Sequence, residues 1–140
     1  MKRIIWDVLI YILIVGGIVY GFPKLLSWWL GTPHPLAAVT SNSMWPVYTE
    51  GDLVVIEGVK KEELKVGDII VFTQLDGPGF TIHRIVKLEK DNLTTKGDAN
   101  FEPDAPIKYE QVAGRGVTIR GKAIHLPYLG SLTMLTNRLK

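Results

Sequence analysis

The residues whose types could perform catalysis are few, and the first of them is a serine in the stretch 40-TSNSMWP-46. This serine, Ser43, carries a hydroxyl that is a weak nucleophile unless a base lies within hydrogen-bonding reach and a third group orients that base. The chain has no cysteine, which excludes a thiolate nucleophile, a disulfide framework and a cysteine-ligated metal site. Ser43 is therefore the candidate nucleophile if the rest of the chain supplies a histidine and an acid.

The chain has three histidines, and their positions differ in rigidity. His34 lies between two prolines in a linker, and His125 lies at the edge of the polar domain. His83 lies within the strand-like run 81-TIHRIVKL-88, in which alternation places it on the face opposite Arg84. A strand holds a side chain rigidly, as a general base requires, so His83 is the best placed of the three as a candidate base. The alternative is a half-exposed strand residue with no catalytic role.

Two acids lie in the loop-like stretch 95-TKGDANFEPDAP-106. Asp98 and Asp104 are six residues apart, in a segment with glycine and proline that follows a predicted strand. Either acid could orient the histidine, whereas the alternative is a solvated turn in which Asp98 bonds to nearby backbone. Two spaced acids could also bind a divalent cation, but no metal-binding spacing surrounds them, and we expect no metal and no cofactor.

Ser41 and Asn42 complete the candidate site. Asparagine tolerates a left-handed backbone, so we expect Asn42 to occupy a sharp turn that presents Ser43 outward. The Ser43 N–H and the Ser41 hydroxyl would then point at one position and could stabilise a developing oxyanion.

The elements that must position these residues begin with an apolar N-terminal segment. Residues 4–22 form a run of nineteen residues with a single charge. As a helix this run would be about 28 Å long, close to the ~30 Å hydrocarbon core of a bilayer. A cleaved signal peptide is the alternative, but its apolar region is normally about 7–15 residues long, and 35-PLAAV-39 lacks a small residue three positions before the cut. We therefore expect an uncleaved transmembrane anchor.

The residues that flank the apolar run predict its orientation. Lys2 and Arg3 precede the run, which favours a cytoplasmic N-terminus and an extracytoplasmic polar domain. Trp6 and the pair Trp28 and Trp29 bracket the run, as interfacial anchors usually do. The expected location is the cell membrane with a single pass, or the endoplasmic reticulum membrane with a lumenal domain in a eukaryote.

After a linker, 32-TPHP-35, the chain changes to short β-type runs. These runs are 53-LVVI-56, 69-IIVFT-73, 81-TIHRIVKL-88, 92-NLTTK-96 and a stretch from Val112 through Ile124. Gly, Asp and Pro signals separate them, which predicts a mainly β fold: a small antiparallel domain tethered by one N-terminal transmembrane α-helix.

We expect the chain to have three parts. Residues 1–30 would be the cytoplasmic N-terminus, the transmembrane helix and an interfacial tryptophan segment, and residues 31–126 the extracytoplasmic catalytic β domain. Residues 127–140 would be an apolar tail. Leu132, Leu135 and Leu139 lie at helical spacing in this tail, so it could lie against the membrane or the domain. A terminal segment that packs on the core is the alternative.

Five motifs in a fixed order carry a resemblance to a known family. They are SNSMWP at 41–46, GDLVVI at 51–56, VGDIIVF at 66–72, IHRIV at 82–86 and TKGDANFEPD at 95–104. Together they resemble the type I signal peptidases, in particular the archaeal and endoplasmic-reticulum branch. The resemblance covers the anchor and nearly the whole β domain, and it implies a mostly antiparallel β structure tethered by a transmembrane helix.

The resemblance also implies a role for each candidate residue. Ser43 matches the nucleophile of the family, His83 matches the general base, and Asp104 matches the third member of the triad. Asp98 matches a supporting acid, and Ser41 matches the serine assigned to the oxyanion hole.

The chain departs from the family pattern at two positions near the site. Asn42 stands where glycine is more frequent, and Ala99 stands where many members have asparagine. Neither departure removes a reacting group, but Ala99 leaves one polar contact fewer beside the acids.

The implied function is a membrane-bound serine endopeptidase that removes N-terminal signal peptides from exported pre-proteins, cutting after small residues. Its partners would be signal-peptide-bearing pre-proteins, the lipid bilayer and the secretion translocon. A net charge of +2 with interspersed acids and bases is no nucleic-acid footprint. The alternative is a non-enzymatic membrane-anchored β-domain binding module. A lysine base, with Lys87 or Lys96 as candidates, is a further alternative, as is a Ser–Lys self-cleaving repressor-type protease, which the anchor disfavours.

Overall fold

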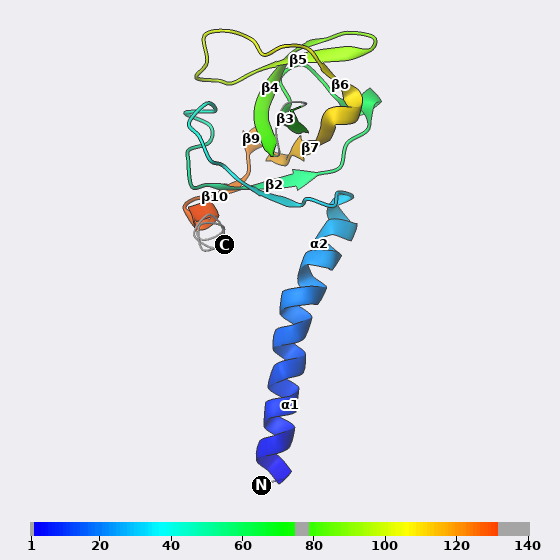
Figure 1. Ribbon diagram of the computed structural model, residues 1–140, viewed down its shortest axis with the longest axis vertical. Helices are drawn as coiled ribbons and strands as arrows, with labels where there is room; N and C mark the ends of the chain where they lie inside the picture. Colours follow the sequence, from blue (N-terminus) through cyan, green and yellow to red (C-terminus); the bar gives the residue numbers. More distant parts are fainter. Residues whose placement is uncertain (1, 75–78, 132–140) are drawn as a thin grey trace.

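A computed structural model describes residues 2–74 and 79–131, as one long helix followed by a β domain (Figure 1). The helix comprises α1 (Lys2–Gly16), a π-helical turn η1 (Gly17–Gly21) and α2 (Phe22–Leu30). The π turn lies directly before Pro23, whose ring clashes with the carbonyl four residues earlier in a regular α-helix. The widened turn therefore lets the helix continue through a proline.

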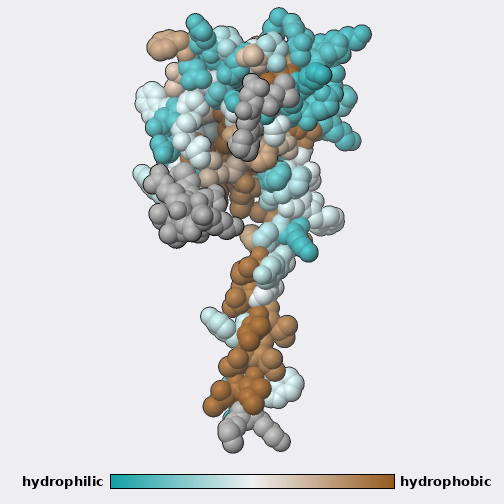
Figure 2. All heavy atoms as spheres, in the orientation of Figure 1, coloured by the Kyte–Doolittle hydropathy of each residue, from teal (hydrophilic) through white to brown (hydrophobic). Residues whose placement is uncertain are grey.

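This helix is long and apolar enough to cross a membrane. It is continuous from Arg3 to Leu30, 28 residues, and none of its most apolar window is buried against the rest of the protein. Figure 2 shows it as a hydrophobic column attached to a mostly hydrophilic domain. A helix of this length measures about 42 Å, more than the ~30 Å core of a bilayer. The apolar run identified in the sequence, residues 4–22, lies within this helix. The helix continues beyond the run, to Leu30.

The helix is joined to the β domain by hydrogen bonds at and just after its C-terminal end. The Gly58 N–H donates to the Leu30 carbonyl over 2.7 Å, and the Thr32 hydroxyl donates to the Ala113 carbonyl over 3.3 Å. A side-chain carbon at Gly58 would overlap the carbonyl of Gly31. Glycine at position 58 thus permits the close approach that holds the helix end against the sheet.

The domain is built from ten short strands and two 3₁₀ turns within the described residues. The strands are β1 (Leu36–Ala38), β2 (Leu53–Glu57), β3 (Ile69–Thr73), β4 (Phe80–Leu88), β5 (Asn92–Lys96), β6 (Ile107–Lys108), β7 (Val112–Gly116), β8 (Thr118–Ile119), β9 (Lys122–Ala123) and β10 (His125–Leu126), and the turns are η2 (Lys61–Glu63) and η3 (Tyr109–Gln111). All strand pairs are antiparallel, in the order β1-β2-β7-β3-β4-β5-β6, with β10 also on β2 and β8–β9 as a separate hairpin. The predicted fold class is confirmed.

The central strands have apolar side chains on both faces, because they lie between two cores. On β3, Ile69 and Val71 pack into one core with Met44 and Tyr48. The alternate residues of β3 pack into a second core between β4, β5 and β6, whose buried members are Leu64, Ile70, Phe72, Ile85, Leu93 and Ile107. Alternation along one strand thereby fills two cores and leaves β3 rigid.

The expected strand boundaries agree closely with the structure for the longer strands. The runs 69–73 and 92–96 match β3 and β5, and β4 begins one residue before the predicted run. The pairing of β4 with β5 shifts register between Ile85 and Lys87, so the simple alternation expected for this strand ends there. The leucines at 132, 135 and 139 lie outside the described residues.

Candidate active site

Ser43 lies in a turn that is held from both sides. Met44 and Tyr48 are buried in the core beside it, and the Ser43 carbonyl accepts the Ala99 N–H over 2.8 Å. Asn42 does not adopt the left-handed backbone that we expected, since its φ angle is not positive. Instead its side-chain oxygen accepts the Glu50 N–H over 2.9 Å, so a side-chain contact closes the turn.

His83 lies within hydrogen-bonding distance of Ser43 on one side and of Asp104 on the other. The Oγ atom of Ser43 is 3.1 Å from Nε2 of His83, and Nδ1 of His83 is 2.6 Å from Oδ2 of Asp104. His83 is 7% exposed and comes from β4, where its ring lies edge-on to Phe72 at 6.3 Å between centroids. A buried imidazole placed between a hydroxyl and a carboxylate has the geometry of a general base that activates a serine.

Asp104 reaches His83 from the loop that follows β5. Its backbone N–H donates to the Thr95 carbonyl over 2.8 Å, and its Oδ2 accepts the Thr95 hydroxyl over 2.7 Å. Its side chain is 26% exposed, so the carboxylate is only partly screened by water. The loop therefore delivers an acid that is fixed at its backbone and at its side chain.

Asp98, which we expected to be a supporting acid, forms an ion pair on the other side of β4. Nε and Nη2 of Arg84 donate to its two carboxylate oxygens over 2.8 and 2.6 Å, and Arg84 Nη1 donates to the Gly67 carbonyl over 2.8 Å. The hydrogen bonds that Arg84 donates to Asp98, and secondarily the charge of Asp98, raise the pKa of the Arg84 guanidinium above its ordinary value. Asp98 thus anchors the acid loop to β4 and has no described contact with Ser43 or His83.

Gly97 allows this loop to pass close to the serine turn. A side-chain carbon there would lie 2.7 Å from the Ser43 carbonyl oxygen. The absent side chain is what lets the Ala99 N–H reach that same carbonyl. The motif around residues 97–104 therefore positions the nucleophile and the acid together.

Ser41 lies beside the candidate nucleophile, at the mouth of a cleft. Its Oγ is 3.2 Å from Oγ of Ser43. The cleft has a volume of about 280 Å³ and runs between the β1 segment and the start of β4. Its lining residues are Ala38, Val39, Thr40, Ser41, Ser43, Met44, Phe80, Thr81, Ile82, His83 and Asn100. The candidate nucleophile and base therefore open onto a small, mixed polar and apolar cleft.

Comparison with known proteins identifies the family of the chain. Residues 23–124 match the family model described as Peptidase S24-like. The chain belongs to this family.

Relatives of this family member are catalytic subunits of signal peptidases. The signal peptidase complex catalytic subunit SEC11C of Homo sapiens is 30% identical over 145 residues, which cover 97% of this chain and 74% of the relative. SEC11 of Lodderomyces elongisporus is 33% identical over 120 residues, and SEC11 of Candida albicans is 32% identical over 120 residues. Each of these matches covers 80% of this chain and 71% of the relative. The resemblance to the endoplasmic-reticulum branch of type I signal peptidases is confirmed, and these catalytic relatives do not favour the non-enzymatic binding module.

The other candidate bases lie elsewhere in this peptidase-family chain. Lys87 pairs with Glu89 over 2.6 Å at the surface, and the ring of His34 packs against Phe80 at 4.9 Å between centroids. His125 is bonded to Asp52 over 2.7 Å. The base that contacts Ser43 in the described structure is His83. Among the described residues, no group of three or more His, Asp or Glu side chains is arranged to hold a metal ion.

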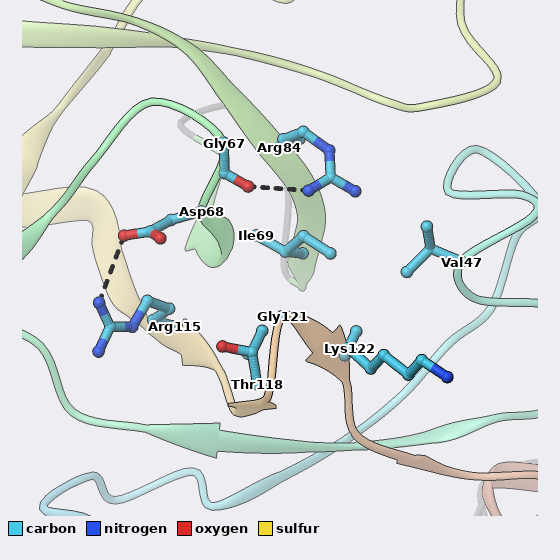
Figure 3. A pocket seen from close by; sticks show the side chains of 11 residues that line it. Val47, Gly67, Asp68, Ile69, Arg84, Arg115, Thr118, Gly121 and Lys122 are labelled. Atoms are coloured by element: carbon cyan, nitrogen blue, oxygen red, sulfur yellow. Dashed lines mark hydrogen bonds and ion pairs between the residues drawn. The ribbon is translucent and has the colours of Figure 1, made fainter.

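A larger cavity, of about 470 Å³, is shown in Figure 3, and its lining does not include Ser43, His83 or Asp104. Its charged lining consists of Asp68, Arg84, Arg115 and Lys122, and Figure 3 shows the dashed contacts from Arg115 to Asp68 and from Arg84 to Gly67. Arg115 also pairs with Glu57 over 2.7 Å, and chiefly this hydrogen bond raises the pKa of its guanidinium. Arg84 and Arg115 are both held in ion pairs and hydrogen bonds with residues of the domain. The larger volume of this cavity therefore does not by itself make it the reactive site.

Three contacts of the site were not identified from the sequence. They are the hydrogen bond from the Thr95 hydroxyl to Asp104, the two-point contact of the Arg84 guanidinium with Asp98, and the hydrogen bond from the Ala99 N–H to the Ser43 carbonyl. Arg84 follows His83 directly, so strand alternation indicates that its side chain lies on the opposite face of β4. An acid could have been expected to pair with it on that face. The other two contacts depend on the path of the loop, for which the sequence carries no periodic signal.

Proposed function

We propose that this protein is a membrane-anchored serine endopeptidase that removes N-terminal signal peptides from exported pre-proteins, cutting after small residues. The observation that carries the proposal is the contact series Ser43, His83 and Asp104, with distances of 3.1 and 2.6 Å, in a chain of the Peptidase S24-like family. The relatives are named as signal peptidase catalytic subunits, and their name is the support for the substrate class.

In the proposed mechanism, Nε2 of His83 accepts the Ser43 proton as Oγ attacks the carbonyl carbon of the scissile bond. The imidazolium that forms is aligned and stabilised by Asp104. The Ser43 N–H and the Ser41 hydroxyl stabilise the oxyanion, and loss of one such donor typically lowers the rate by ~10²–10³-fold. His83 then gives its proton to the leaving amine. Water, activated by the same imidazole, hydrolyses the acyl-enzyme.

The edges of two strands suggest how the substrate is held. Within residues 2–74 and 79–131, the segment from Phe80 to His83 pairs with β3 alone, because β5 begins to pair with β4 at Arg84. β1 pairs with β2, and no described strand pairs with its other edge. Both free edges border the cleft, so an extended peptide can add to them as a strand. The cleft is smaller than the ~300–1,000 Å³ of typical ligand pockets, which suits small side chains near the cut.

The helix and the exposed tryptophans support placement at a membrane. Trp28 and Trp29 are 81% and 76% exposed at the end of the helix, and Trp45, next to the serine turn, is 59% exposed. We propose residues 1–30 as the anchor with a cytoplasmic N-terminus, and residues 31–126 as the extracytoplasmic catalytic domain. Trp45 would contact the headgroups. Met44, by contrast, is buried in the core.

The partners under this proposal are the pre-protein, the bilayer and the secretion machinery. A signal peptide reaches the bilayer through the translocon, so an enzyme that cuts it there works beside the translocon. The relatives are named as subunits of a signal peptidase complex. We therefore propose that the chain associates with the translocon or with partner subunits in the membrane.

The test is cleavage of a pre-protein with an Ala-x-Ala site by the full chain in liposomes. Ser43→Ala should lower the rate by about 10⁶-fold, the size of loss seen when a serine protease loses its nucleophile. Ser27→Ala, which changes a serine on α2 without a described side-chain hydrogen bond, should cleave at the wild-type rate. Undiminished cleavage by Ser43→Ala would refute the proposed function.

A further inference from the structure

Thr95 is bound to Asp104 twice. Its hydroxyl donates to Oδ2 over 2.7 Å, and its carbonyl accepts the Asp104 N–H over 2.8 Å. Nδ1 of His83 contacts the same carboxylate oxygen, Oδ2, at 2.6 Å. One oxygen of Asp104 therefore meets both the threonine and the imidazole.

Thr95 lies on a buried, paired strand. It is 0% exposed, and it pairs across the β4–β5 ladder with Ile85, which lies two residues from His83 on the same face of β4. Neighbouring Leu93 is also fully buried in the second core. The hydroxyl thus projects from a packed strand and not from the loop that carries Asp104.

A donor at this position has a consequence for the orientation of the carboxylate. The terminal torsion of an aspartate is broad and roughly two-fold, so backbone position alone does not select which oxygen faces a partner. A hydroxyl that donates to Oδ2 makes the two oxygens inequivalent and limits rotation about the Cβ–Cγ bond. The alternative is that Asp104 merely satisfies a buried hydroxyl, which would affect stability but not the chemistry of the histidine.

We propose that Thr95 is a positioning residue for the reaction, whose hydroxyl holds Oδ2 of Asp104 against Nδ1 of His83. This inference rests on the proposed Ser43–His83–Asp104 mechanism. Thr95 does not touch the substrate. It acts through Asp104, in the way that hydrogen bonds to a catalytic group fix its orientation in an active site.

The test compares three variants of the full chain in liposomes with an Ala-x-Ala pre-protein. Thr95→Val keeps the shape and removes the donor, Thr95→Ser keeps the donor, and Thr94→Val changes the neighbouring, half-buried threonine on the opposite face of β5. We expect Thr95→Val to lower kcat by about 10- to 100-fold, the range for a hydrogen bond to a charged group, with KM nearly unchanged. Thr95→Ser and Thr94→Val should retain wild-type kcat.

The pH–rate profile separates positioning from a structural role. A carboxylate free to turn away stabilises the imidazolium less, so the acidic limb of the Thr95→Val profile should move to lower pH while the Thr94→Val limb stays in place. A Thr95→Val enzyme with wild-type kcat and an unmoved limb would overturn the inference, as would a Thr95→Ser enzyme as slow as Thr95→Val. Because Ser43→Ala is measured beside them, failure of the inference alone is distinguished from failure of the proposed function.

Discussion

The pair His83–Asp104 and the pair His125–Asp52 have almost the same local geometry. Nδ1 of the histidine lies 2.6 Å from Oδ2 of the aspartate in the first pair and 2.7 Å in the second. Each imidazole also has an aromatic ring beside it, with centroid distances of 6.3 Å to Phe72 for His83 and 5.6 Å to Tyr48 for His125. A histidine bonded to an aspartate is therefore not by itself the mark of a reactive site.

The two pairs differ in what surrounds them. Nε2 of His83 contacts the hydroxyl of Ser43, which opens onto the cleft. Asp52 accepts instead from the amide and the hydroxyl of Thr49, over 2.9 and 3.1 Å, in the turn before β2. The second pair ties β10 to that turn, and we expect it to stabilise the fold without taking part in the reaction.

Replacing each aspartate separates the two pairs most strongly. Asp104→Asn should lower kcat by about 10⁴-fold, because the amide no longer holds the imidazole in the correct tautomer or stabilises its cation. Asp52→Asn should leave kcat within about threefold of wild type and lower the melting temperature instead. The measurement is steady-state cleavage of an Ala-x-Ala pre-protein, with thermal unfolding followed by circular dichroism. Equal losses of kcat in the two variants would remove the distinction between the pairs.

Replacing Asp98 should lower kcat less than replacing Asp104, because the ion pair between Asp98 and Arg84 holds the loop and does not contact the imidazole of His83. Asp98→Asn should lower kcat by about tenfold, as the loop that holds Asp104 loses a two-point attachment. Asp91→Asn, a change at an exposed acid in the β4–β5 turn, should leave kcat unaltered. The same cleavage assay measures both, and a loss in Asp98→Asn as large as in Asp104→Asn would mean that Asp98 takes part in the reaction directly.

The stability of the fold at low pH should depend on the pair His125–Asp52. Burial alone would raise the pKa of Asp52, but hydrogen bonds from the Thr49 amide, from His125 and from the Thr49 hydroxyl outweigh it and hold the pKa below its ordinary value. A lowered folded-state pKa adds stability above the unfolded-state value of about 3.9, and this stability is lost as the pH falls through the folded-state pKa. The melting temperature of wild type should therefore fall more steeply below about pH 4 than that of Asp52→Asn. Parallel curves for the two proteins would contradict this assignment.

The parts of the fold that could be predicted are those with strong local patterns. The strands β3 and β5 have apolar or β-branched runs bounded by turn residues, so their ends were recognised. The strands β1, β6 and β10 have two or three residues each, too few to show any periodicity. Their pairing is set by tertiary contacts that no local pattern records.

The candidate site divides in the same way. Ser43 and His83 were candidates from their residue types and surroundings, Asp104 was chosen over Asp98 by the family resemblance, and the structure brings the three together. The Thr95 hydroxyl was missed because its orientation depends on the β4–β5 register, which includes a shift between Ile85 and Lys87. The expectation for Asn42 was wrong because a side-chain hydrogen bond, and not a left-handed backbone, closes the turn.

The most direct measurement is the initial rate of pre-protein cleavage by His83→Ala and His125→Ala, in the same liposomes and below both melting temperatures. We expect His83→Ala to be slower than wild type by at least about 10³-fold and His125→Ala to remain within about threefold. Wild-type cleavage by His83→Ala, or equal losses in the two variants, would contradict the claim that the histidine bonded to Ser43 is the general base.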